Sequence, residues 1–259
     1  DKTYAGIKKE LSPYGVCGLD FKELEADEKK YVKKCFKEQI LSVLSPQIVD
    51  SSHPFPHLMN KDIYVTANLK HINSRKNKDD KEKEQILGIV PVPTYVSDIL
   101  MLPGHDIRYI RMEKVIMEYL NLVFDQYEVS DPNYICVTRN ADVSPDDEAL
   151  EVTDDFRKLM QSTLHKRRRM AVVRLETAEK LTPEMQEYFC KKFKITPEQI
   201  FRTKMPMKLD YMFSIAGNLP ESMKKALVYE PFSPQKSAHV QDGNMVKQVK
   251  KNDIMYFYP

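Results

Sequence analysis

A run of basic residues is the part of this sequence whose residue types best suit chemistry with phosphate. Residues 165–169 read His-Lys-Arg-Arg-Arg and place four cations side by side, Lys166, Arg167, Arg168 and Arg169. Adjacent guanidinium groups suit phosphate oxygens, so the run is a candidate contact for a polyanion. The same run ends a predicted helix, where cations complement the negative end of the helix dipole. The pattern therefore favours a solvated helix end, with the polyanion contact as the alternative interpretation.

Two further arginines are candidate contacts for the same kind of ligand. Arg139 and Arg174 each lie at or near the end of a predicted strand. A guanidinium there can meet a phosphate or an acid, and a structural salt bridge explains either residue equally well.

The histidines provide no recognisable catalytic pair. His53 and His57 lie four residues apart, a metal-ligand spacing on a helix, but Pro54 and Pro56 exclude a helix there. The other four are far apart and lie near no serine or cysteine in a nucleophile motif: His71, His105, His165 and His239. We predict no catalytic residue and no metal site. A hydrolase acting through His57 or His105 is an alternative supported by residue types alone.

Two ligand loops are also excluded by their spacing. Asn140, Asp142, Ser144 and Glu151 match positions 1, 3, 5 and 12 of a calcium loop, but Pro145 stands where that loop requires glycine. Acids at the start of a helix explain the same residues. The chain has seven glycines, and they form neither of the common phosphate-binding loops. We therefore predict no cofactor site within this segment.

Composition indicates an ordinary folded protein. The 259 residues are 42% hydrophobic and 30% charged, enough for one large domain with a sizeable core. A net charge of +2 predicts no nucleic-acid partner, and no apolar run is long enough to span a membrane. The four scattered cysteines favour reduced thiols and a cytoplasmic location. The start at Asp1 and the stop at Pro259 suggest that both ends are cut.

The elements that position these residues can be read from periodicity. Apolar residues at three- and four-residue spacing predict an amphipathic helix over residues 27–44, ended by Pro46. Alternation predicts a strand over residues 63–72, and the charged stretch 73–84 predicts an exposed hairpin loop before a return strand at 85–92.

The rest of the chain mixes both patterns. We predict a strand at 106–110, a helix at 112–124, a buried strand at 134–138, a helix at 145–167, a strand at 170–176, a helix at 182–193, a polar connector at 233–243 and a short helix from 246. The first strand pair indicates antiparallel pairing, while 134–138 and 170–176 are compatible with a crossover unit. The predicted class is α+β, with helices packed on one mixed, largely antiparallel sheet.

Five segments, in order, carry a resemblance to a known family. They are Pro-Phe-Pro-His-Leu at 54–58, Arg-Tyr-Ile-Arg-Met-Glu-Lys-Val-Ile at 108–116, Tyr-Ile-Cys-Val-Thr-Arg-Asn-Ala-Asp at 134–142, Val-Arg-Leu-Glu at 173–176 and Asn-Asp-Ile-Met-Tyr-Phe-Tyr-Pro at 252–259. Together they resemble the polyphosphate kinase family. The resemblance departs at Pro93-Thr94-Tyr95, where the family commonly has an arginine in place of Thr94.

The resemblance implies a location within a longer enzyme. Residues 1–14 would be the tail of an N-terminal helical domain, 15–245 the middle or head domain with a fold like that of phosphohistidine phosphatases, and 246–259 a connector into catalytic domains that lie beyond this sequence. The family's catalytic histidines lie in those domains, so no catalytic residue carries over.

The same resemblance implies the activity and the partners. The full-length enzyme would use ATP and Mg to transfer the terminal phosphate of ATP reversibly to polyphosphate through a phosphohistidine. This segment would contribute to homo-oligomer assembly and to a nucleotide and polyphosphate tunnel, with the remaining domains of the same enzyme as partners. The sequence contains no signal for or against peripheral membrane association. The alternative function is a non-catalytic module that binds a polyanion or a protein and merely shares the fold.

Overall fold

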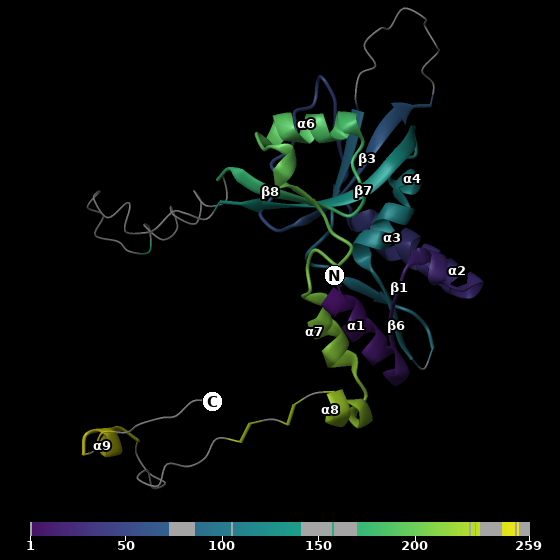
Figure 1. Cartoon of the computed structure of the whole chain (residues 1–259). Helices are drawn as coiled ribbons and strands as arrows, with labels where there is room; N and C mark the ends of the chain where they lie inside the picture. Colours follow the sequence, from purple (N-terminus) through teal and green to yellow (C-terminus); the bar gives the residue numbers. More distant parts are fainter. Residues whose placement is uncertain are drawn as a thin grey trace, which may run out of the picture. The chain divides into compact units, whose positions relative to one another are not determined.

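The computed structural model describes residues 2–72, 86–104, 106–140, 157, 170–227, 229–230, 232–233, 245–251 and 253 (Figure 1). Two compact units make up the chain, Asp1–Asn218 and Leu219–Pro259. The described part of the second unit contains two short helices, α8 (Glu221–Leu227) and α9 (Met245–Val249). The domain boundaries expected after residues 14 and 245 stay predictions. Within the described ranges, no helix has the length and apolar character that crossing a bilayer requires.

A six-stranded sheet forms the centre of the first unit. Its strand order is β2-β4-β3-β7-β8-β9, and every neighbouring pair is antiparallel except β8 and β9. The strands are β2 (Gln47–Val49), β3 (Ile63–His71), β4 (Ile86–Pro91), β7 (Tyr127–Arg139), β8 (Val172–Thr177) and β9 (Ile200–Arg202).

Helices cover both faces of this sheet. Alternate side chains of β3 point to opposite faces, so Val65 joins one buried cluster while Tyr64 joins the other. The first cluster packs against α2 (Ala26–Cys35), which continues through the π-helical turn η3 (Phe36–Ile40), and against α3 (Met112–Glu118). The second packs against α6 (Pro183–Phe193). Figure 1 shows α6 and α3 on opposite sides of β3 and β7.

A second, three-stranded sheet has the order β1-β6-β5, with β1 (Val16–Leu19) parallel to β6 (Ile107–Arg111) and β5 (Ile99–Met101) antiparallel to it. Strand β6 runs into α3 without a loop, so Arg111 is its last residue and the N-cap of the helix. The remaining elements of the described unit are α1 (Lys2–Leu11), α4 (Leu120–Val123), α7 (Tyr211–Asn218) and the 3-10 turns η1 (Ser12–Tyr14), η2 (Phe21–Glu23), η4 (Leu41–Val43) and η6 (Pro197–Gln199).

The structure confirms the predicted fold class and several elements. The helix expected over 27–44 is present as α2, η3 and η4 in succession. The strand pair at 63–92 is antiparallel, with Thr66 opposite Ile89. Helix α6 begins where expected, because the Thr182 hydroxyl accepts a hydrogen bond from the Met185 amide at 3.3 Å. The hairpin loop expected over 73–84 and most of the helix expected over 145–167 lie outside the described residues.

Three expectations are wrong. The described strands form two sheets and not one, because among them β1, β5 and β6 pair only with each other. The helix expected over 112–124 is interrupted at Tyr119, whose φ of −105° and ψ of 21° separate α3 from α4. Strands β7 and β8 form no crossover unit, since Ile135 lies antiparallel to Thr177. Residue 139 pairs with 172, so the chain re-enters the sheet at the end of the strand that it left and need not cross it.

Candidate functional site

The two described arginines of the predicted polyanion contact lie on adjacent strands. Arg139 ends β7 and Arg174 lies in β8, and the ladder pairs Thr138 with Arg174. Lys166, Arg167, Arg168 and Arg169 lie outside the described residues. Their contact with phosphate therefore stays a prediction.

The Arg139 guanidinium binds backbone carbonyls. Its Nε and Nη2 donate to the Leu58 carbonyl at 3.0 and 2.8 Å, and its Nη1 donates to the Met170 carbonyl at 2.7 Å. The Arg139 amide also donates to Asn60 Oδ1 at 2.8 Å. Burial lowers the pKa of Arg139. This side chain therefore ties the segment after Pro-Phe-Pro to the residue that directly follows the basic run.

Arg174 has the salt bridge that was its alternative interpretation. Its Nη2 donates to Glu176 Oε1 at 2.9 Å, and its guanidinium lies 4.5 Å from the centre of the Phe201 ring. The side chain is 46% exposed, so a ligand can still reach it. The pair on the sheet surface contributes little to stability.

The described histidines form no metal cluster. His53 Nδ1 lies 2.9 Å from Asp50 Oδ1, while His57 Nδ1 lies 3.5 Å from Arg139 Nη2. Within the described ranges no group of three metal-ligating side chains occurs. His105, the other residue of the hydrolase alternative, lies outside the described residues.

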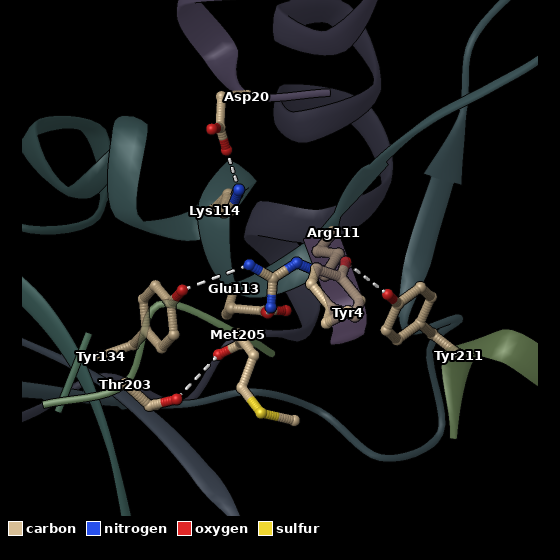
Figure 2. A network of polar contacts seen from close by, with 9 residues as sticks. All are labelled: Tyr4, Asp20, Arg111, Glu113, Lys114, Tyr134, Thr203, Met205 and Tyr211. Carbon is tan, nitrogen blue, oxygen red and sulfur yellow. Dashed lines mark hydrogen bonds and ion pairs between the residues drawn. The ribbon is translucent and has the colours of Figure 1, made fainter. Parts of the chain in front are cut away.

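A buried ion pair at the β6–α3 junction is the strongest polar feature that the motifs did not predict. Arg111 Nη1 donates to Glu113 Oε1 at 2.5 Å, and Nη2 donates to the Tyr134 hydroxyl at 3.3 Å (Figure 2). Arg111 is 8% exposed and Glu113 is 5% exposed. Burial opposes the charge of Arg111, but Glu113 and Tyr134 outweigh it and raise the pKa of Arg111. Burial raises the pKa of Glu113, and the Arg111 charge opposes that rise.

Lys114, the next residue on α3, lies in a second ion pair with Asp20 (Figure 2). The Lys114 side chain is 22% exposed and Asp20 is 56% exposed. Burial, together with the nearby Lys8 ammonium, lowers the pKa of Lys114 to about 8. Asp20 opposes that change because an adjacent carboxylate favours the charged lysine.

These groups line a cavity of about 90 Å³, here called the polar cavity. Four cationic side chains, one carboxylate and two tyrosines surround it: Lys8, Arg111, Lys114, Lys204, Asp20, Tyr4 and Tyr109. They come from α1, the β6–α3 junction, the segment after β1 and the segment after β9. Gly18 is required beside Tyr109, since a Cβ there would lie 2.7 Å from the Tyr109 hydroxyl oxygen.

Tyrosine hydroxyls connect the first and last elements of this unit beside the cavity. The hydroxyls of Tyr4 and Tyr211 lie 2.8 Å apart (Figure 2). The Tyr109 and Tyr211 rings are 5.8 Å apart between centres. Burial raises the pKa of Tyr109 to about 12, so its hydroxyl is a hydrogen-bond donor at neutral pH.

A smaller cavity of about 30 Å³ is lined by both Arg111 and Glu113. Thr94 lines it, together with Asp98 and Lys208. Thr94, where the family commonly has an arginine, therefore lies at the same cavity as the Glu113 carboxylate, which pairs with Arg111. The cation that meets Glu113 here comes from β6.

The polar cavity presents donors and positive charge, which suits binding an anion. Sequence reasoning missed it because its cations are scattered from Lys8 to Lys204 and only the fold brings them together. The one available signal was the pattern Arg111-Met112-Glu113-Lys114, which places three charges at a strand-to-helix junction rich in apolar residues.

Comparison with known proteins agrees with this architecture. The family described as polyphosphate kinase middle domain matches residues 27–215. The chain is 28% identical over 249 residues to a polyphosphate kinase of Bacillus anthracis, covering 95% of this chain and 34% of that protein. A polyphosphate kinase of Pseudomonas syringae pv. tomato is 27% identical over 270 residues, covering 100% of this chain and 35% of that protein.

The fold has a counterpart among solved structures. The crystal structure of polyphosphate kinase from Porphyromonas gingivalis superposes with a TM-score of 0.65 at 22% identity, covering 93% of this chain and 33% of that one. The chain thus spans about a third of the length of the relatives that it matches. Because the family match covers most of the sequence, this chain belongs to the polyphosphate kinase family and comprises its middle domain.

Proposed function

We propose that this chain is the non-catalytic middle domain of an enzyme that reversibly transfers the terminal phosphate of ATP to polyphosphate through a phosphohistidine. The match of the middle-domain family to residues 27–215 carries the proposal. The chain covers 34% of a relative named polyphosphate kinase, which leaves room in such a protein for domains that perform the transfer.

ATP, Mg and polyphosphate belong to this proposal as ligands of the full-length enzyme. So do the homo-oligomer and the cytoplasmic location. The role of the middle domain is to support assembly and to form part of the wall along which nucleotide and polymer lie.

We further propose that the six basic candidates have two different roles, direct contact with the polymer and positioning of the contacting residues. The run from Lys166 to Arg169 contacts the polymer, and the exposed side of Arg174 adds to that surface. Arg139 positions the run, because its guanidinium binds the carbonyl of Met170, the next residue along the chain.

The test compares the 259-residue chain with an intact protein that contains it, each incubated with ATP, Mg and labelled polyphosphate. We expect transfer by the intact protein and none by the chain alone. Transfer by the isolated chain at a comparable rate would place the chemistry within the middle domain and overturn the proposal.

A binding series separates this function from a general polyanion-binding module. The intact protein is titrated with polyphosphate and with single-stranded RNA at several salt concentrations. A polyphosphate-specific surface should prefer the base-free polymer at every salt concentration, whereas a general binder should show the same salt-dependent loss for both. Equal affinities would favour the alternative.

A further inference from the structure

The polar cavity contains more positive than negative charge. Lys8, Lys114, Lys204 and Arg111 face it, while Asp20 is the carboxylate among its lining residues. Glu113 neutralises Arg111 from outside the cavity. Two positive charges therefore have no counter-charge among the described residues around it.

The cavity combines buried and exposed cations: Arg111 is buried and Lys114 is partly buried, while Lys8 and Lys204 are exposed. The Lys114 side chain is 22% exposed, and burial, with a smaller effect from the nearby Lys8 charge, lowers its pKa. Exposed cations need no protein counter-charge, but several cations that converge on one cavity attract an anion to it. The arrangement is thus suited to binding a negatively charged ligand.

Size narrows the choice of that ligand. One water needs roughly 10–15 Å³ in the same measure, and drug-sized ligands occupy pockets of about 300–1,000 Å³. At about 90 Å³ the polar cavity is larger than a water site and too small for a nucleobase with its sugar. A compact anion of several heavy atoms fits.

The donors indicate the kind of anion. Arg111 has five N–H donors, and the contacts with Glu113 and Tyr134 account for two of them. Ammonium groups approach from α1 and α3, and the Tyr109 hydroxyl adds a neutral donor. Donors that converge from several directions suit an anion with oxygens on all sides and with a charge near −2, which describes a phosphate group.

We propose that the polar cavity binds a single phosphate group, held by Lys8, Lys114, Lys204 and Arg111. The source is either free orthophosphate or the terminal phosphate of a longer chain. Only the second source rests on the function proposed above.

Calorimetric titration of the intact protein at constant ionic strength tests this site, first with orthophosphate and then with tripolyphosphate. The cavity variants are Lys114→Met and Lys8→Gln, and the matched control is Lys37→Gln, which removes an exposed cation of η3 outside the cavity. We expect each cavity variant to weaken orthophosphate binding about tenfold or more. The control should stay within about twofold of the unmodified protein, because an isolated surface charge contributes little.

The two titrants distinguish the sources. Weakening of both by Lys114→Met indicates that the cavity accepts the end of a phosphate chain. Weakening of orthophosphate alone indicates free phosphate as the ligand. If both cavity variants bind both titrants as the Lys37→Gln control does, the proposal is wrong.

Two measurements keep the result interpretable. Circular dichroism verifies that Lys114→Met is folded. If Lys114→Met does not fold, the affinity of Lys8→Gln for phosphate tests the site instead, because Lys8 lies on the exposed side of α1 and its replacement should not disturb the fold. A parallel transfer assay separates the two proposals. Phosphate binding without transfer contradicts only the proposed function, and transfer with binding unaffected by the cavity variants contradicts only the phosphate site.

Discussion

Lys114 is the residue on which the electrostatics of the polar cavity depend most. The Asp20 carboxylate favours the charged form of the Lys114 ammonium. Burial and the nearby Lys8 charge oppose that form. The pKa of Lys114 is lowered from 10.5 to about 8. A lysine whose pKa is lowered in the folded state makes the stability of the protein depend on pH.

The sign of that dependence can be predicted. Between about pH 8 and 10.5 the unfolded chain holds a proton on Lys114 that the folded chain has released, so the free energy of unfolding should rise with pH across this window. Denaturant unfolding at several pH values, in the protein and in Lys114→Met, measures the rise. The variant should lack it.

The comparison isolates one group because the other titratable side chains around the cavity are the same in both proteins. These are Tyr4, Lys8, Asp20, Tyr109, Arg111 and Lys204. Parallel curves for the two proteins would mean that Asp20 restores an ordinary pKa to Lys114.

The Arg111 and Glu113 pair leads to a second residue-scale prediction. Replacing Arg111 with Met leaves the Glu113 carboxylate buried without its cation, which should lower the free energy of unfolding by about 3–5 kcal/mol. The double variant Arg111→Met with Glu113→Leu removes both charges and should recover much of that loss. Urea denaturation of the two variants measures both values. A double variant as unstable as the single one would show that the pair is worth more than its desolvation.

At the scale of elements, Arg139 joins three segments: the end of β7, the carbonyl of Leu58 and the carbonyl of Met170. We predict that Arg139→Lys lowers polyphosphate affinity nearly as much as Arg139→Ala, because a single ammonium cannot reproduce the planar fork that reaches both carbonyls. Titration of the intact protein with polyphosphate checks this. The matched control is Arg202→Lys on β9, whose Nη2 meets Glu179 at 2.6 Å on the surface.

The two substitutions distinguish positioning from direct contact. If Arg139→Lys binds normally while Arg139→Ala does not, charge alone matters and Arg139 itself touches the polymer. Thermal unfolding of both variants verifies that the effect is not a general loss of stability.

The elements that were predictable are those with a long, clear pattern. Residues 63–72 alternate because Ile63, Val65, Ala67 and Leu69 all face the first buried cluster while Thr66, Asn68 and Lys70 face the other way. Thr182-Pro183 starts α6 by a local cap. Strands β2, β5 and β9 contain three residues each, too few for any period to be visible. The first half of β7 is mostly exposed and contains Pro132, so its pairing with β3 depends on the partner strand and not on its own sequence.

At the scale of the whole molecule, the two units differ in how much core they contain. Both buried hydrophobic clusters of the described residues are formed by residues up to Met207. We predict that a chain ending at Asn218 unfolds cooperatively, with a free energy of unfolding within about 1 kcal/mol of the 259-residue chain, because its core is retained. Denaturant unfolding of both chains checks this. A large loss of cooperativity would show that residues beyond 218 complete the domain, as the predicted boundary at residue 245 implies.

The polar cavity could not be predicted because its lining residues are distant in sequence. The class of fold follows from local patterns, but the cavity requires Lys8, Lys114 and Lys204 to meet, and no local rule relates residues so far apart. The basic run at 165–169 was visible because its charges are neighbours in sequence. A cluster of charges in the folded protein therefore need not be visible as a cluster of charges in the sequence.

The hydrogen bond between Tyr4 and Tyr211 has a consequence for the order of folding. It joins residues 207 positions apart, so closing it early would cost the entropy of a very long loop. Contacts of such high sequence separation form late, after the sheets between them have brought the ends together. The environment of these two phenols should therefore report the last step of folding, the step in which α1 docks and the cavity acquires Lys8.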